Sequence, residues 1–184
     1  MNEDERKRLE ATAYHEAGHA VVARVGCVMP FREVSIVPDE KEGSLGHVRY
    51  WYPPFRGDNI YLEDDQRTRT KVEKIIMRAL AGGVAEEMYT GQENREGASE
   101  DLESAQAYAE ALCHGYFPES EAHLQYLRAR TKHILQRQWE QVEDLATALL
   151  ERKRVKSKEV SQIWAAGIQR RKEAWAADRQ LREE

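Results

Sequence analysis

The sequence predicts a mainly α-helical domain that carries one small β-hairpin. Apolar residues recur at helical spacing over most of the chain, and residues 72–84 are a clear example. Alternation of polar and apolar residues, which is typical of strands, is confined to residues 32–52. The sequence shows no internal repeat and no low-complexity segment, so a solenoid or a long linker is not expected.

The length and charge of the chain limit its organisation and its partners. Its 184 residues suit one domain, and we expect a single domain over residues 1–184, with a core from about residue 6 to 165 and a charged helix or tail over residues 166–184. A net charge of −5 argues against nucleic acid as the main partner. Two cysteines cannot build a disulfide framework, and no apolar run suits a transmembrane span or a signal peptide. These observations predict a cytoplasmic protein without a membrane span.

The first helix is expected to begin near residues 3–6 and to continue to Val25. Acidic residues open it, as the helix dipole favours, and Gly26 is a suitable end before Pro30. Apolar residues surround it on nearly all sides between positions 11 and 25, which indicates a buried helix.

Two histidines in this helix, His15 and His19, stand four residues apart, and Glu16 follows the first directly. Residues at this spacing share one helix face, with Cβ atoms about 5–6 Å apart, so both imidazoles can bind one ion. Glu16 lies at the flank of that face, where it can reach a metal-bound water rather than the metal. The pattern predicts the H-E-x-x-H site of a zinc metalloprotease, with two ligands and a general base.

A hairpin is expected after the first helix. Residues 32–38 read as one strand, residues 39–44 as a turn and residues 45–52 as the return strand. Prolines bound both strands, which suggests a position at the edge of a sheet. Residues 53–65 then predict a surface loop.

A second helix is predicted from about Gln66 to Tyr89, with its end at Gly91. It contains Gly82 and Gly83, each of which costs about 1 kcal/mol relative to alanine in a helix. We expect a close approach to the histidine-bearing helix to compensate for that cost.

The remaining chain reads as further helices. A third is expected from Ser99, its predicted N-cap, to about Gly115, with Asp101 on the same face as its apolar residues. A long helix or a helix pair follows over residues 119–152, and Ser157 is expected to cap a last helix. The basic residues 152–154 predict a helix end and a solvated turn.

Several motifs resemble, in the same order, the peptidase domain of the FtsH-type ATP-dependent zinc metalloproteases. They are residues 14–23, residues 80–87 with Gly91 after them, and residues 97–102, while residues 145–160 are similar to the end of that domain. The resemblance covers residues 6 to about 165. It implies a compact helical zinc-peptidase domain with a small sheet beside the active-site helix, and Asp101 as the third zinc ligand. It also implies that unfolded polypeptide substrates align beside an edge strand around residues 45–48.

The sequence also departs from that family. Family members carry an AAA ATPase module and membrane helices ahead of this domain, whereas this sequence contains no G-x-x-x-x-G-K-[ST] loop. ATP-driven unfolding would therefore require a separate AAA ATPase partner. Family rings are held largely by the ATPase module, so a hexamer is not implied. Gly83 replaces a usual arginine, and Glu96 replaces a common threonine.

The leading hypothesis is a zinc-dependent endopeptidase of the H-E-x-x-H type that cleaves unfolded or flexible polypeptides. His15, His19 and Asp101 would hold Zn²⁺, and Glu16 would take the proton of the attacking water and return it to the leaving amine. The alternative is a catalytically silent adaptor or regulator that binds peptides or a separate ATPase, but the complete residue set argues against it. A purely structural zinc site is disfavoured, because such sites usually have four ligands rich in cysteine.

Two other carboxylates compete with Asp101 for the third ligand position. Glu86 and Glu87 are candidates, because many H-E-x-x-H peptidases take a glutamate from a following helix. We favour Asp101 because its helix face is the buried one and because of the resemblance. One glutamate of the pair, Glu87 rather than Glu86, is then expected to hydrogen-bond a ligand imidazole. The other histidines are expected to be surface or core residues: His47, His114, His123 and His133.

Overall fold

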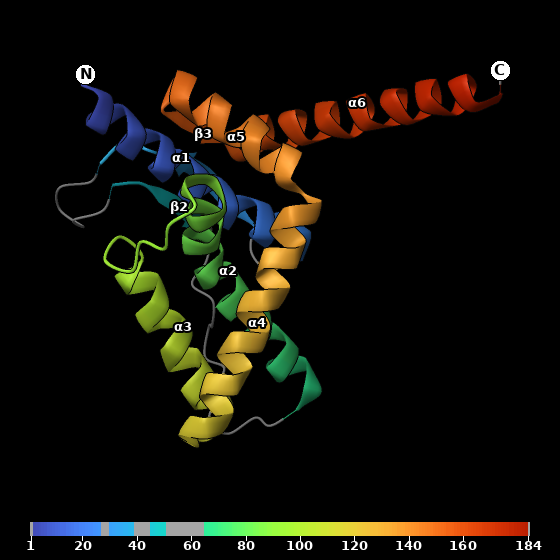
Figure 1. Cartoon of the computed structure of the whole chain (residues 1–184). Helices are drawn as coiled ribbons and strands as arrows, with labels where there is room; N and C mark the ends of the chain where they lie inside the picture. The colour runs from blue at the N-terminus through green and yellow to red at the C-terminus, as the bar shows by residue number, and fades with distance from the viewer. Residues whose placement is uncertain (1, 27–29, 39–44, 51–64, 184) are drawn as a thin grey trace.

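The structure is a computed structural model, and it describes residues 2–26, 30–38, 45–50 and 65–183. These residues form six helices and a small antiparallel sheet, so the predicted mainly α-helical class is confirmed (Figure 1). The predicted loop at residues 53–65 lies almost entirely outside the described residues. The elements in chain order are α1 Glu3–Gly26, β1 Phe31–Ser35, β2 His47–Tyr50, α2 Gln66–Thr90, α3 Ser99–Leu112, α4 Phe117–Arg137, α5 Trp139–Arg152, β3 Arg154–Lys156 and α6 Ser157–Glu183.

Helices α1 and α2 form the centre of the fold. Every residue of α1 from His15 to Ala23 is buried, as its apolar surroundings predict. The two helices approach closely at Gly18, where an added Cβ would lie 2.5 Å from the Cβ of Ala85 and 2.6 Å from the carbonyl oxygen of Ala81. Because of this contact, one face of α2 lies directly against the helix that carries both histidines.

The sheet has the strand order β2–β1–β3, with β1 antiparallel to both neighbours. The hairpin of β1 and β2 is confirmed, and β2 is an edge strand among the described residues. The third strand was not predicted, because the segment was read as a solvated turn. It has only three residues, of which Val155 is fully buried opposite Val34.

The end of α2 was predicted correctly, whereas the cap at the start of α3 was not. Gly91 ends α2 in the left-handed conformation, with φ 74°, as its position predicts. Ser99, however, is the first residue of α3 and not its N-cap, which is Ala98. The side chain at the N-cap makes no capping hydrogen bond, and in the preceding turn Asn94 accepts a hydrogen bond from the N–H of Gly97 at 3.0 Å.

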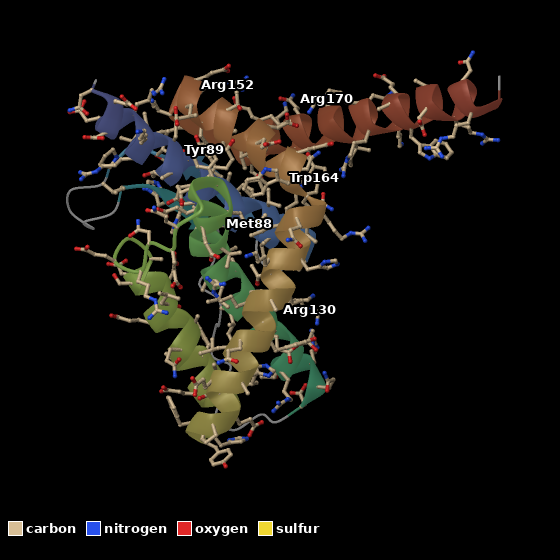
Figure 2. The ribbon with its side chains drawn as sticks, viewed as in Figure 1. Met88, Tyr89, Arg130, Arg152, Trp164 and Arg170 are labelled. Carbon is tan, nitrogen blue, oxygen red and sulfur yellow. The ribbon has the colours of Figure 1, made fainter. Side chains whose placement is uncertain are left out.

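The C-terminal region contains the predicted helix pair, α4 and α5, followed by α6. Helix α6 packs through its first part, where Val160 is buried and the guanidinium of Arg24 lies 5.2 Å from the Trp164 ring centroid. Beyond Arg170 the helix extends away from the rest of the molecule (Figures 1 and 2), and Trp175 is 66% exposed. No described helix is both long and apolar enough to span a membrane. The assignment of the whole chain to one domain stays a prediction.

Candidate metal centre

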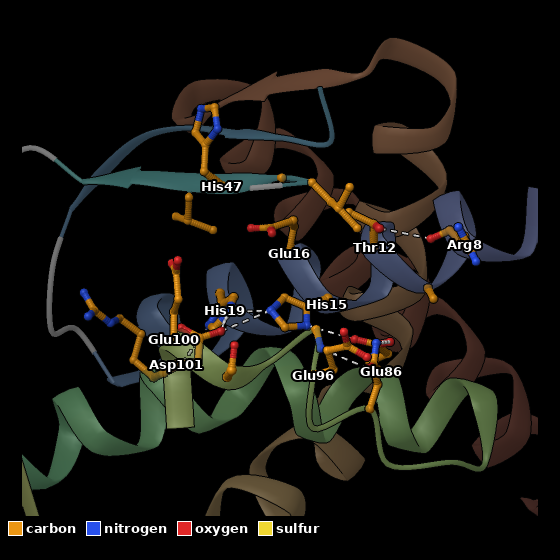
Figure 3. A pocket seen from close by; sticks show the side chains of 18 of the residues that line it. Arg8, Thr12, His15, Glu16, His19, His47, Glu86, Glu96, Glu100 and Asp101 are labelled. Carbon is orange, nitrogen blue, oxygen red and sulfur yellow. Dashed lines mark hydrogen bonds and ion pairs between the residues drawn. The ribbon is translucent and has the colours of Figure 1, made fainter. Parts of the chain in front are cut away.

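The structure brings together the three residues that the sequence proposes as metal ligands. His15 and His19 point from α1 toward Asp101 in the first turn of α3 (Figure 3). The Nε2 atoms of the two rings are 3.1 Å apart. The Oδ2 atom of Asp101 lies 3.2 Å from Nε2 of His15 and 3.0 Å from Nε2 of His19. A helix more than eighty positions later in the sequence thus closes the site that the histidine pair opens.

Hydrogen bonds to the far side of each ring determine which nitrogen faces the centre with a lone pair. Nδ1 of His19 donates to the backbone carbonyl of Arg78 at 2.8 Å. A carbonyl can only accept, so this nitrogen carries the proton and the neutral ring keeps a lone pair on Nε2. Nδ1 of His15 donates in the same way to Oε2 of Glu86 at 3.0 Å.

The three donor atoms fit a zinc ion. Tetrahedral zinc with ligands at about 2.0–2.1 Å separates neighbouring ligand atoms by roughly 3.3 Å. The separations here are 3.0–3.2 Å. Two neutral imidazoles and a carboxylate leave a fourth position for water, which is the pattern of catalytic rather than structural zinc sites.

The structure corrects the choice between the paired glutamates. Glu86, not Glu87, holds the His15 imidazole, and its other oxygen accepts a hydrogen bond from Nδ2 of Asn94 at 2.8 Å. Glu87 forms ion pairs with Arg128 and Lys132 of α4. Adjacent helix residues point about 100° apart, so only the Glu86 side chain faces α1.

Gly82 is required by the close packing of α2 against the histidine rings. A Cβ at this position would lie 2.3 Å from Nε2 of His19 and 2.4 Å from Nε2 of His15. The predicted close approach of this glycine to the histidine helix is therefore confirmed. At Gly83 an added Cβ would meet only the Cβ of Ala98, at 3.3 Å.

Glu16 lies between the histidine pair and strand β2 (Figure 3), and it is 6% exposed. Gly46 leaves room for it, since a Cβ there would lie 2.8 Å from Oε1 of Glu16. Burial raises the pKa of Glu16 against the opposing effect of the two histidines, and the charge of Asp101 raises it further. A carboxyl group with a raised pKa is better able to accept a proton and to return it near neutral pH.

The charges of the ligand group are strongly coupled. Burial alone lowers the pKa of His15, but its hydrogen bonds with Asp101 and Glu86 outweigh this effect and raise the pKa to about 10. Burial raises the pKa of Asp101, yet the two histidines hold it well below its usual range. Without a metal ion, a proton on His15 offsets the negative charge at this site.

A cleft of about 710 Å³ opens onto the centre, with β2 on one side and the start of α3 on the other. His47 of β2 points away from the histidine pair (Figure 3), which agrees with the expectation that it is not a ligand. Tyr50 and Arg78 are among the residues of the cleft wall that sequence reasoning missed. The only sequence signal for Arg78 is its position one helical turn before Gly82.

Comparison with known proteins places this site in a family. The model of peptidase family M41 matches residues 1–117, which include both histidines, Glu16 and Asp101. The chain is 38% identical over 104 residues to the chloroplastic "ATP-dependent zinc metalloprotease FTSH 1" of Oryza sativa, and 33% identical over 111 residues to "ATP-dependent zinc metalloprotease FtsH 3" of Synechocystis.

A third relative is the "ATP-dependent zinc metalloprotease FtsH" of Caulobacter vibrioides, which is 36% identical over 110 residues. The matches to these three relatives cover 54–58% of this chain but only 13–16% of the relatives' length. The matched segment of the M41 model spans α1 to α3 and thus all the elements that supply the histidines and Asp101. The chain therefore belongs to peptidase family M41.

Proposed function

We propose that this chain is a zinc-dependent endopeptidase that cleaves unfolded or flexible polypeptides. The arrangement of two imidazole Nε2 atoms and one carboxylate oxygen within 3.2 Å of one another carries the proposal. The printed names of the relatives, which are zinc metalloproteases, support the identity of the ion. We propose His15, His19 and Asp101 as the ligands and Glu16 as the general base.

A zinc ion at this position would supply a Lewis acid that lowers the pKa of water and polarises the scissile carbonyl. Glu86 and the carbonyl of Arg78 fix the two imidazole rings in the orientation that such binding requires. Glu16 accepts the proton of the attacking water on its carboxylate. It then returns this proton to the leaving amine, which its raised pKa favours.

The edge strand β2 is the surface that suits an extended substrate. A peptide can add to an exposed sheet edge through main-chain hydrogen bonds, which fix its register without requiring a defined sequence. Leu45 and Gly46 precede β2 at the mouth of the cleft, and Leu45 is 62% exposed. An unfolded or flexible polypeptide can present the extended backbone that suits this edge.

Folded substrates are proposed to reach the cleft only after an AAA ATPase has unfolded them. The relatives are named as ATP-dependent, and they are far longer than the part that this chain matches. The alternative function is a silent adaptor that binds peptides without cleaving them, and the buried Glu16 beside a complete ligand set argues against it.

The experiment measures zinc content and casein digestion for the wild-type chain and Glu16→Gln, with and without a chelator. We expect about one zinc per chain in both proteins, and at least about 10²-fold slower digestion by the variant, the scale for loss of a general base. Glu103→Gln, an exposed carboxylate on α3, is the matched control and should digest at the wild-type rate. Zinc binding without any chelator-sensitive digestion by the wild type would favour the adaptor.

A further inference from the structure

Arg78 and Tyr50 form a pair in the cleft wall beside the metal centre. The guanidinium carbon of Arg78 lies 4.4 Å from the centroid of the Tyr50 ring. Both residues line the same cleft as the histidines. The backbone carbonyl of Arg78 accepts the hydrogen bond from His19, so the cation belongs to a residue that directly adjoins the centre.

The local structure of the sheet places Tyr50 at this position. The register of β1 against β2 shifts between Phe31 and Glu33, which puts a bulge opposite Tyr50. A bulge redirects side chains and is common next to active sites. Stacking on a ring also restricts the guanidinium before any ligand arrives, so less conformational entropy is lost on binding.

Tyr50 is a hydrogen-bond donor over the whole working pH range. Burial raises its pKa against the opposing effect of Arg78, and the charges of Glu16 and Asp101 raise it further. The influence of these two carboxylates also indicates that the phenol lies close to the reacting region. The pair therefore offers a fixed cation together with a neutral O–H group.

The cation stands out because most charges of the cleft are negative. Five carboxylates line it: Glu16, Glu86, Glu96, Glu100 and Asp101. The other cation of the lining, Arg8, lies on α1 about two turns before His15, whereas Arg78 adjoins His19. Arg78 is therefore the cation whose residue directly adjoins the metal centre, and it makes the His19 end of the cleft attractive to an anion.

We propose that Arg78, which lies over the Tyr50 ring, binds a carboxylate of the substrate peptide within about two residues of the scissile bond. The planar guanidinium fork matches a carboxylate with two parallel hydrogen bonds, which a neutral peptide carbonyl cannot accept in the same way. The carboxylate comes from an acidic side chain or from a free C-terminus. This inference rests on the proposed peptidase function and names the kind of substrate that the site prefers.

The test compares cleavage of peptides that are identical except near the cleaved bond. One series carries Glu or Gln at each flanking position, and a second ends in a free carboxylate or an amide. Wild type should cleave a carboxylate-bearing peptide with a kcat/KM roughly 10-fold or more above its neutral partner, the scale of hydrogen bonds to a charged group. The series that shows the preference identifies the source of the carboxylate.

Three variants test whether Arg78 and Tyr50 cause the preference for carboxylate peptides. Arg78→Gln keeps the backbone carbonyl that holds His19, so zinc should stay bound while the preference falls to about one. Tyr50→Phe keeps the ring beneath the guanidinium. This variant should therefore lose only part of the preference for carboxylate peptides. Arg24→Gln removes a cation over Trp164 outside the cleft lining, and should keep the wild-type preference. A carboxylate-to-neutral ratio that is equal in wild type and Arg78→Gln in both peptide series would overturn the proposal.

A binding measurement separates this inference from the proposed function. Zinc-loaded Glu16→Gln is titrated with the same labelled peptides, and anisotropy reports affinity without turnover. Tighter binding of the carboxylate peptides, lost in Glu16→Gln/Arg78→Gln, would support the inference even if wild type cleaved nothing. Cleavage by wild type with no charge preference in either assay would overturn it and leave the peptidase function standing.

Discussion

At the residue scale, the ring of His15 is fixed from both of its nitrogens, by Glu86 on one side and Asp101 on the other. The two carboxylates therefore have different tasks, although both contact the same imidazole. Asp101 also reaches His19, at 3.0 Å, whereas Glu86 contacts only the outer nitrogen of His15 in this pair. This geometry supports Asp101 as ligand and Glu86 as the residue that orients the ring.

Zinc titration of three variants tests this division. Asp101→Ala should leave the site nearly empty, because only two ligands remain. Glu86→Ala should weaken binding about 10–100-fold, as is usual when a hydrogen bond to a ligand imidazole is lost. Glu87→Ala is the neighbouring control and should bind zinc like wild type. Normal zinc binding by Asp101→Ala, with loss in Glu86→Ala, would reverse the assignment.

The zinc-free protein should become less stable as pH rises above neutral. The pKa of His15 is about 10 in the fold against about 6.5 in an unfolded chain. Protonated His15 therefore stabilises the fold, and this contribution is fully present below about pH 6.5. The contribution is lost as the pH rises toward 10. Asp101 and Glu86 have lowered pKa values, so their contribution is instead lost in acid.

Thermal unfolding in chelator at pH 6, 8 and 9.5 measures this effect. The melting temperature of wild type should fall with rising pH more steeply than that of His15→Gln, which cannot bind the proton. Parallel curves for the two proteins would contradict the coupling between His15 and the carboxylates.

The sequence identified residues that share a motif, and it missed those placed only by packing. His15, Glu16 and His19 follow from helical spacing, and Asp101 follows from its helix face and from the family resemblance. The choice of Glu86 over Glu87 depends on the rotation of α2 against α1, which no local pattern encodes. The contact between Tyr50 and Arg78 joins a strand and a helix, and its bulge leaves no signal in the sequence.

At the scale of elements, the metal centre depends on how closely α2 packs against α1. Gly82 allows that contact, and Gly83 lies next to it in the sequence but faces Ala98. Gly82→Ala would place a methyl group 2.3–2.4 Å from both Nε2 atoms, so the rings or the helices must shift. We expect Gly82→Ala to lose zinc binding, whereas Gly83→Ala should keep it.

Both glycine variants gain the same intrinsic helix stability of about 1 kcal/mol, so the comparison isolates the steric effect at the centre. Zinc affinity and melting temperature should be measured for both proteins. Equal zinc affinity in the two variants would show that α2 can move away from the histidines at little cost.

The predictable elements are those whose own residues carry the signal. The bounds of α1 and α2 agree with the expected ones to within a few residues, because periodic apolar stripes and a glycine end define them. Strand β3 could not be predicted, because a strand of three residues is defined by its partner β1 and not by its own pattern. Ser99 misled because α3 begins at this residue, after Ala98, whose side chain makes no capping hydrogen bond.

At the scale of the whole molecule, tertiary packing stabilises the core helices but not the outer part of the C-terminal helix. The buried cluster runs from Ala13 to Val160, so burial stabilises each helix within that range. The expected domain core over residues 6–165 stays a prediction. The outer part of α6 has no such support, since its described side chains from Lys172 to Gln180 are exposed.

Removal of residues 172–184 should therefore leave the fold and the zinc site intact. Among the described side chains, the outermost contacts of α6 with α5 are the fit of Gly167 against Gln141 and the ion pairs Arg170–Asp144 and Arg171–Glu140. Truncation after Arg171 keeps all of these contacts. We expect a change in the free energy of unfolding within about 0.5 kcal/mol, the usual range for surface changes, and unchanged zinc affinity.

Val160→Ala is the control inside the core, and it should cost about 2 kcal/mol through lost burial and a cavity. Hydrogen exchange adds an independent measurement, because a helix without tertiary contacts is marginal in water. Amides beyond residue 171 should exchange far faster than those of α1 from His15 to Ala23, which are buried. Protection of the outer α6 amides equal to that of α1, together with loss of zinc on truncation, would mean that this helix is packed in solution and belongs to the core.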